Sequence, residues 1–234
     1  MIQKLLALIL LISLSACDNS SSSSEKQQKG PKNGLVHTYN ADGSISASIN
    51  YKEGIRHGLA SDFYTDGKLR AKIDYVNGVK EGNAKWYHRN GNLFRITDYI
   101  ADQRHGFQKK YYDDGTLMSE AKFHEDFAGL GLKEYSQSGN ERKAKTTFVL
   151  GESTRMPDGS TVVEVRLSNK VKEITFYQGE LIDSKFLHSG LDEVNKTANM
   201  GYLTFPAGVK QLSVIAMYKT RYKNYRVVQE IVKK

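Results

Sequence analysis

The sequence is poor in the residues that build covalent or metal-bound frameworks. It has one cysteine, three prolines and one tryptophan among 234 residues. A single cysteine excludes an intramolecular disulfide framework and a CxxC metal ribbon. No apolar run reaches the ~20 residues that a membrane-spanning helix needs. With 39% hydrophobic and 26% charged residues, the composition is that of a globular protein.

The N-terminal residues 1–16 have the pattern of a signal peptide. Lys4 supplies a positive charge, an apolar run extends from Leu5 to Ile12, and small residues follow. Leu14-Ser15-Ala16-Cys17 resembles the lipobox of bacterial lipoproteins, in which the cysteine is acylated, palmitate being a common acyl group, after cleavage. We therefore predict lipidation at Cys17 and a membrane anchor, with an ordinary secretory cysteine as the alternative.

A serine-rich stretch, residues 17–33, follows the signal peptide and contains no large apolar side chain. Such a segment cannot bury enough surface to fold, so we predict a flexible tether. Asp18 resembles a signal for retention in the inner membrane. The expected location is the cell envelope, and the choice between the periplasmic face of the inner membrane and the outer membrane stays open.

The middle of the chain, residues 34–146, is built from a repeated unit of constant length. The repeats begin at Gly34, Gly58, Gly82, Gly106 and Leu130. Each contains a glycine after Asp, Asn or Ser, a pair typical of tight two-residue hairpin turns: Gly43, Gly67, Gly91, Gly115 and Gly139. Apolar residues alternate after the turns, as at Leu69, Ala71 and Ile73, which is the period of a half-buried strand. The pattern predicts an antiparallel β-meander.

One aromatic position recurs before each turn, and we expect its rings to stack along one face. The residues are Tyr39, Phe63, Tyr87, Tyr111 and Tyr135. The segments YKEGIRHG and YVNGVKEG resemble the MORN-repeat family, in its 24-residue bacterial variant. Asp102 and Asp126 depart from that pattern by replacing the connecting glycine. Bacterial proteins with these repeats are often described as antitoxin-like, so the resemblance implies a toxin as one candidate partner.

From about Phe148 the repeat stops, and short strand-like segments separated by turn signals follow. They are STVVEVRL, KVKEITFY, ELIDSKFL, GYLTF, VKQLSVIAMY and YRVVQEIV. We predict a small immunoglobulin-like β-sandwich over residues 147–234, with LHSGLDEVNKTANM as a loop or short helix. The whole chain is therefore expected to be all-β, an elongated antiparallel meander of MORN-like hairpins followed by this sandwich.

Catalytic and metal-binding patterns do not occur in the sequence. There is no GxSxG elbow and no phosphate-binding glycine loop. His57 and His105 lie two repeats apart, about 19 Å at the usual strand spacing, too far to share one ion. We predict that the protein is not an enzyme and has no metal or cofactor.

The segment YKTRYKNYR, Tyr218 to Arg226, alternates tyrosines with basic residues. Secretion makes nucleic acid an implausible partner. A contact with a membrane surface is one interpretation. The favoured one is a pair of strands around a Lys-Asn turn.

The resulting hypothesis is a membrane-anchored, non-catalytic repeat scaffold that binds a protein, lipid or cell-wall partner. The side chains proposed to contact it are Tyr64, Trp86, His88 and Tyr112. The alternative is an antitoxin or immunity-like protein that neutralises a toxin. A structural envelope component is a third hypothesis.

Overall fold

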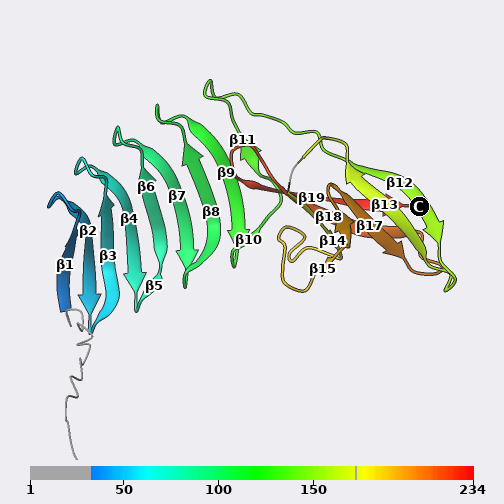
Figure 1. Ribbon diagram of the computed structural model, residues 1–234, viewed down its shortest axis with the longest axis horizontal. Coiled ribbons are helices and arrows are strands. Elements are labelled where there is room, and N and C mark those ends of the chain that lie inside the picture. Colours follow the sequence, from blue (N-terminus) through cyan, green and yellow to red (C-terminus); the bar gives the residue numbers. More distant parts are fainter. Residues whose placement is uncertain (1–32, 172) are drawn as a thin grey trace, which may run out of the picture. The chain divides into compact units, whose positions relative to one another are not determined.

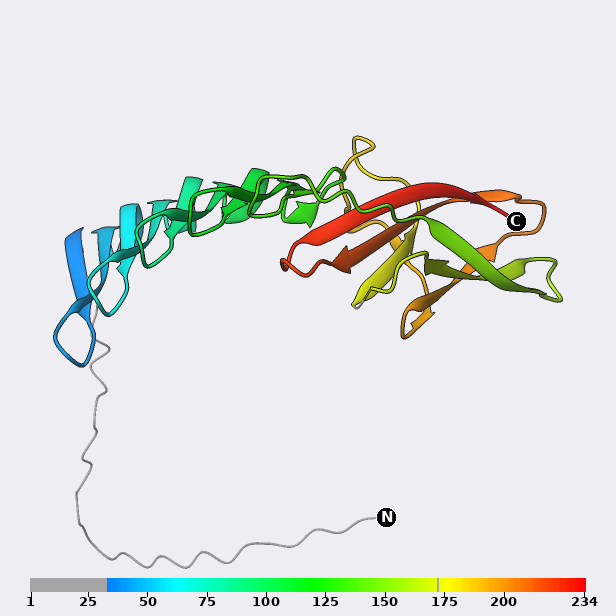
Figure 2. The same cartoon turned by 90° about the horizontal axis from the view of Figure 1, so that it is seen from above.

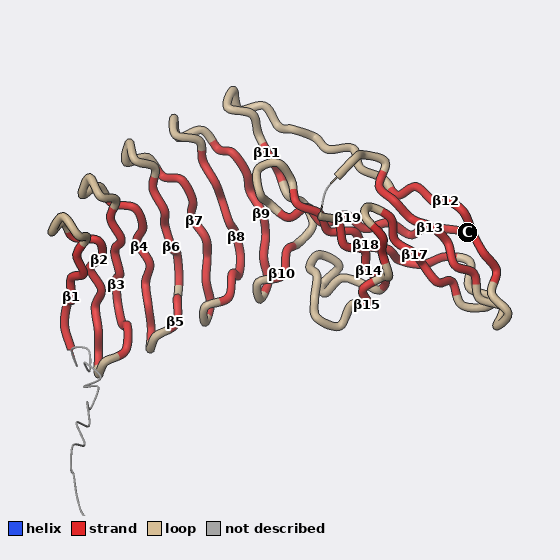
Figure 3. Tube along the Cα trace, in the orientation of Figure 1, coloured by secondary structure: helices blue, strands red, loops and turns tan. Residues whose placement is uncertain are grey.

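The structure, a computed structural model, describes residues 33–171 and 173–234, which belong to one compact unit. The predicted signal peptide, Cys17 and nearly all of the tether lie outside the described residues. Asn33, which the sequence places at the end of the tether, already belongs to the first strand. The described chain contains strands and loops but no helix (Figure 3). The all-β prediction is therefore confirmed.

The larger sheet is an 11-stranded antiparallel meander in which successive strands are neighbours (Figure 1). Its strands are β1 (Asn33–Tyr39), β2 (Ile45–Lys52), β3 (Ile55–Phe63), β4 (Leu69–Val76), β5 (Val79–Lys80), β6 (Gly82–Tyr87), β7 (Leu93–Ile100), β8 (Gln103–Tyr111), β9 (Leu117–His124), β10 (Phe127–Ala128) and β11 (Lys133–Glu134). Both β10 and β11 pair with β9 at the C-terminal end of this sheet.

The glycines predicted to form two-residue turns lie in longer loops instead. In the first loop the N–H of Asn40 donates to the Ser44 carbonyl at 2.8 Å and Gly43 N–H donates to Asn40 at 3.0 Å. Gly43 has a φ of 82°, whereas Asp42 before it does not have a positive φ. The Asp42 carboxylate instead accepts the Ser44 N–H at 3.0 Å. This is a type I turn closed by a left-handed glycine. Figure 2 shows these loops following one another along the sheet.

The two-residue turns are found at the opposite ends of the strands. Glu53-Gly54, Asn77-Gly78, Ala101-Asp102 and Glu125-Asp126 all have positive φ at both residues. This is the conformation of a type I′ hairpin, which matches the twist of the flanking strands. Asp102 and Asp126 therefore keep the backbone geometry of the glycine that they replace.

Alternate residues divide the repeat sheet into two faces. The face bearing Ala71, Tyr75, Ala84 and Thr97 is buried, and we call it the packed face. The other, which we call the open face, bears exposed side chains such as Lys72. This is the two-residue period expected from the sequence.

The remaining strands form two four-stranded antiparallel sheets. One has the order β12 (Phe148–Arg155), β13 (Thr161–Leu167), β17 (Met200–Phe205), β16 (Lys196–Thr197). The other has the order β15 (Asp192–Glu193), β14 (Ile174–Gln178), β18 (Gln211–Lys219), β19 (Tyr225–Lys233). Val165, Leu203 and Phe205 from one sheet form a single core with Phe176 and Val214 from the other. The strand order is that of an immunoglobulin-like sandwich, as predicted.

Two segments of this region differ from the sequence predictions. ELIDSKFL is not a strand, because Asp183 and Ser184 have positive φ and Ser184 N–H bonds back to the Leu181 carbonyl. The turn directs Leu181 and Leu187 into a core shared with the repeat sheet. LHSGLDEVNKTANM contains the short strands β15 and β16 rather than a helix.

Candidate functional site

Three of the four proposed contact residues hold neighbouring repeats together. The hydroxyl of Tyr64 donates to the Tyr87 carbonyl at 2.7 Å, and the hydroxyl of Tyr112 donates to the Tyr135 carbonyl at 2.8 Å. His88 Nε2 lies 3.0 Å from the Tyr111 carbonyl. Each of these contacts reaches forward to the next repeat. The side chains therefore have a structural role, and their role in partner binding stays a prediction.

The recurring aromatic position makes its inter-repeat contacts through backbone carbonyls. Tyr87, Tyr111 and Tyr135 supply the three carbonyls that accept these bonds. Their rings form no ring pair with one another among the described residues. The predicted ring stack along one face is thus replaced by a series of side-chain to backbone bonds.

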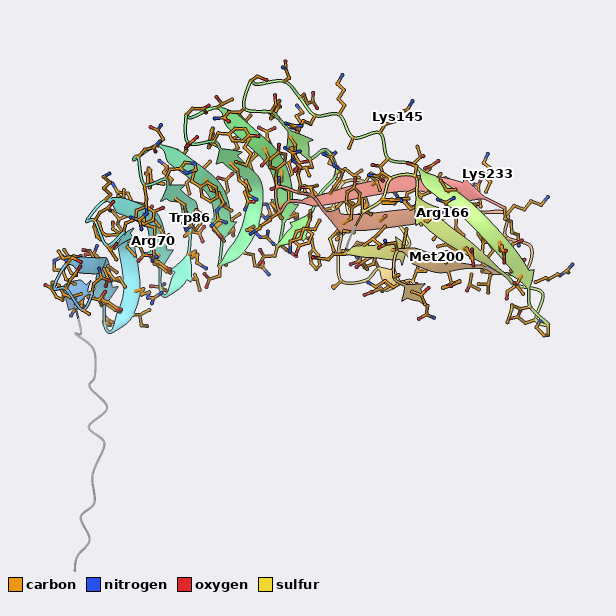
Figure 4. All side chains as sticks on the ribbon, turned by 45° about the horizontal axis from the view of Figure 1, so that its top comes forward. Arg70, Trp86, Lys145, Arg166, Met200 and Lys233 are labelled. Atoms are coloured by element: carbon orange, nitrogen blue, oxygen red, sulfur yellow. The ribbon has the colours of Figure 1, made fainter. Side chains whose placement is uncertain are left out.

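Trp86, the fourth proposed contact residue, is labelled in Figure 4, and its pairing with Ala71 places it on the packed face of the repeat sheet. The Arg95 guanidinium lies 3.7 Å from the centroid of its ring. Burial lowers the pKa of Arg95, whose Nε has no hydrogen-bond partner among the described residues. The indole face thus compensates part of the desolvation of a buried cation.

Similar cation–ring contacts recur along the packed face, one per repeat. Arg56 lies over Tyr75 at 5.4 Å, Lys80 over Tyr99 at 5.3 Å, and Arg104 over Phe123 at 4.1 Å. The three cations share one position of the repeat, and the three rings share another. A sheet with one layer thus covers its aromatic side chains with aliphatic stems and charges that recur with the repeat.

The last repeat is joined to the sandwich through a buried carboxylate. Glu134 is 6% exposed and accepts hydrogen bonds from Thr220 at 2.6 Å and Asn224 at 2.8 Å. Arg226 forms an ion pair with it at 3.4 Å. The partners lie on the β18–β19 hairpin, so the basic and aromatic segment Tyr218 to Arg226 is a pair of strands around a turn, as favoured from the sequence.

The same hairpin covers Lys110, which is 8% exposed on the packed face. Its Nζ donates to the backbone carbonyls of Tyr222 at 3.2 Å and Lys223 at 3.4 Å. Burial, together with the nearby Arg95 guanidinium, lowers the pKa of Lys110 to about 8. A cavity of about 450 Å³ lies beside the hairpin, with Glu134 and Arg226 in its wall. These two residues form the ion pair that joins the two regions, whereas Lys219 and Glu173 in the same wall pair with each other at 3.4 Å.

A row of lysines crosses the open face of the repeat sheet, and we call it the lysine row. Strand pairing places Lys72 opposite Lys85, and continues through Ile96, Lys109, Glu120 and Lys133 on the following strands. Lys109 pairs with Glu120 at 3.1 Å. Lys72 and Lys85 are exposed, and neither forms an ion pair with another described residue. Like charges directly opposite one another disfavour the sheet, so this pair is not explained by stability.

The sequence contains a signal for this row that a sum of charges does not reveal. Lys85, Lys109 and Lys133 occupy the same position in three successive repeats. Comparing basic residues at equivalent positions of the repeats, and on the same face of the strands, would have found these lysines, whereas a sum of charges does not.

Two histidines of the repeat region, His105 and His124, pack against one another. The rings of His105 and His124 lie 4.8 Å apart, and His124 lies 5.5 Å from Phe186. Within residues 33–171 and 173–234, no three His, Cys, Asp or Glu side chains are placed to hold a metal ion. The same described part contains no helix long and apolar enough to cross a bilayer.

Comparison with protein families identifies the repeats. Three tandem stretches, residues 56–77, 80–101 and 104–125, match the MORN repeat variant. Their starting points are spaced by one repeat, as the sequence pattern predicts. The search of curated proteins found no match. The first and last repeats fall outside the matched MORN stretches, although their loops have the same backbone hydrogen bonds, as at Asn40 and Ser136.

Proposed function

We propose that this chain is a lipid-anchored, non-catalytic scaffold whose MORN repeats hold an acidic protein on their open face in the cell envelope. The observation that carries the proposal is the exposed Lys72 and Lys85 pair within the lysine row. An acidic surface laid across the row would relieve the repulsion between these two charges, and would supply steering and specificity for the partner.

The packed face is a weaker candidate for this surface. Trp86 there is covered by Arg95, and Lys110 is covered by the β18–β19 hairpin. Side chains of the open face are less occupied by the fold. Phe107, 38% exposed, adds an apolar contact beside the row, with the Lys122 ammonium 5.0 Å from its ring centroid. Aromatic side chains are enriched in protein–protein interfaces, and lysines around them would supply charge complementarity to an acidic partner.

The membrane anchor in this proposal rests on the lipobox-like residues Leu14 to Cys17. A Cys17→Ser variant is expected to leave the membrane fraction and lose the mass of the acyl chains. Full-length chain that stays membrane-bound and unmodified at residue 17 would contradict the anchor. The antitoxin-like alternative stays a prediction, since no surface of the described residues favours a toxin over another acidic protein as the partner.

The test of partner binding is crosslinking in living cells, followed by capture of the tagged full-length chain and mass spectrometry. Wild type is expected to retain one stoichiometric acidic protein. The double variant Lys72→Glu/Lys85→Glu is expected to lose it, because both charges of the pair are reversed.

The matched control is Lys143→Glu/Lys145→Glu, which reverses the same number of exposed charges outside the repeat sheet. This control should retain the partner. Equal capture by both double variants would overturn the assignment to the lysine row. Retention of lipid or cell-wall fragments in place of a protein would overturn the partner class.

A further inference from the structure

Strand β1 is an edge strand without the charged residues or prolines that usually protect such strands, and its pairing with β2 has one register irregularity, between Thr38 and Tyr39. Among the described residues it pairs with β2 alone, and its sequence NGLVHTY has no Lys, Arg, Asp, Glu or Pro. Natural edge strands usually carry charges, prolines or bulges that prevent another strand from adding to them. The other long edge strands of the described chain carry such charges, as Glu152 and Arg155 on β12 and Glu230 and Lys233 on β19 show.

The hydrogen bonds of the loop after β1 determine which residues of β1 direct their backbone groups away from β2. The N–H of Asn40 donates to the Ser44 carbonyl, and its carbonyl accepts from the Gly43 N–H, so both backbone groups of Asn40 point toward the β2 side. Successive residues of an extended strand direct these groups to opposite sides. The outward N–H and carbonyl groups therefore belong to Leu35, His37 and Tyr39.

The side chains at these positions include two large exposed apolar groups. Leu35 is 54% exposed and Tyr39 is 62% exposed. They lie symmetrically on either side of His37. An antiparallel copy of β1 with its two-fold axis at His37 would place Leu35 opposite Tyr39 at both ends, and an aliphatic–aromatic pair directly across two strands is favourable.

We propose that two copies of this chain associate through β1, antiparallel and centred on His37. Three residue pairs then exchange backbone hydrogen bonds, and the two repeat sheets become one. The pairing is isologous and closes at two copies, because the β10 edge of each sheet is already paired with residues 185–187 of its own chain. The Leu130 N–H donates to the Lys185 carbonyl at 2.8 Å, and the Leu187 N–H donates to the Ala128 carbonyl at 3.2 Å. The lysine rows of both copies would lie on the same side of the joined sheet, which doubles the surface offered to a partner. The inference goes beyond the proposed function and stands without it.

A single cysteine at the two-fold axis tests the register. Hydrogen-bonded antiparallel pairs have Cα atoms about 5.5 Å apart, within the range of a disulfide. Full-length His37→Cys is expected to form a disulfide-linked dimer on mild oxidation in the cell envelope. Ser48→Cys, opposite His37 on β2 and one strand further from the axis, is the matched control and should not. The parent chain, with Cys17 only, reports any linkage through that residue.

A charge exchange at the same position tests the association itself. Two full-length copies with different C-terminal tags are co-expressed, and capture of one through the other is measured. His37→Lys alone and His37→Glu alone should each reduce co-capture several-fold, since like charges meet at the axis. Co-expression of the Lys variant with the Glu variant should restore it.

Restored co-capture of the Lys and Glu variants distinguishes pairing at His37 from damage to the fold, because a misfolded copy could not be repaired by an oppositely charged copy. Equal co-capture in all combinations would overturn the proposal. So would wild-type chains that are not captured together, or a His37→Cys chain that stays monomeric because another segment covers β1.

Discussion

The two ends of the repeat sheet differ in the contacts that cover them. At the C-terminal end, Glu134, Lys110 and Leu132 contact the sandwich through hydrogen bonds and a shared apolar core. At the N-terminal end, β1 exposes Leu35 and Tyr39 and has one neighbouring strand among residues 33–171 and 173–234. A repeat array needs a cap at each end to remain soluble and monomeric. Within the described residues, the chain caps its C-terminal end itself, and the β1 pairing that we propose would cap the other end.

The largest effect is expected from Glu134→Ala at the capped end. The change leaves the nearly buried Arg226 guanidinium without its carboxylate and removes the acceptor of Thr220 and Asn224. Unfolding in urea, followed by Trp86 fluorescence, should show a loss of about 3 kcal/mol. Glu120→Ala, which breaks the more exposed pair with Lys109, should cost less than about 1 kcal/mol. Similar losses for the two would mean that the cap does not depend on its buried charge.

The apolar side chains at the two ends should differ almost as strongly. Leu187 is 5% exposed in the shared core, so Leu187→Ala should lower the free energy of unfolding by about 2–3 kcal/mol. Leu35→Ala at the open end should change it by less than about 0.5 kcal/mol. Both are measured in the His37→Lys background, in which association through β1 is expected to be weaker. A large loss at Leu35 in that background would show that β1 is packed within its own chain.

Much of this comparison could be predicted from the sequence, but the cap could not. The regular repeat located the loops, the strand faces and the MORN units because each depends on residues close in sequence. Glu134 and Asn224 lie far apart along the chain, and no local pattern links them. The composition of ELIDSKFL predicts a strand, whereas its role in the cap requires a turn.

The hydroxyl groups between repeats should have a smaller, graded effect. Tyr64→Phe removes one bond and should cost about 1 kcal/mol. Tyr112→Phe should cost somewhat more, because its hydroxyl also lies 3.3 Å from that of Tyr222 in the cap. Tyr39→Phe at the open end is the control, since its hydroxyl makes no hydrogen bond within the described chain. Urea unfolding of all three variants ranks them, and an equal cost for Tyr39 would contradict the structural role of the other two.

The smallest expected effect is a change in acid sensitivity at the two-residue turns. Burial alone would raise the pKa of Asp126, but hydrogen bonds from Arg104 outweigh it and hold the pKa below the ordinary value of 3.8. The carboxylate therefore stabilises the fold above that value, and the stabilisation is lost as the pH falls through the lower pKa of the folded state.

Asp126→Gly, which restores the residue found at Gly78, keeps the positive φ and removes the titrating group. Thermal unfolding from pH 6 to 2 should show a shallower acid decline for this variant than for wild type. A decline as steep as that of the wild type would mean that other carboxylates account for the acid loss.

The hydrogen bonds of Tyr64, His88 and Tyr112 all reach forward to the next repeat, and this common direction predicts the order in which the hairpins open. The loops that begin at Tyr64, His88 and Tyr112 are each held by the repeat that follows, and the last repeat is held by the sandwich. Opening should therefore begin at β1 and advance one hairpin at a time toward the cap. In the His37→Lys chain, in which pairing through β1 is expected to be weaker, amide hydrogen exchange should form a gradient, fastest in β1 and slowest in β9. The repeat sheet would then open progressively from β1 toward the sandwich.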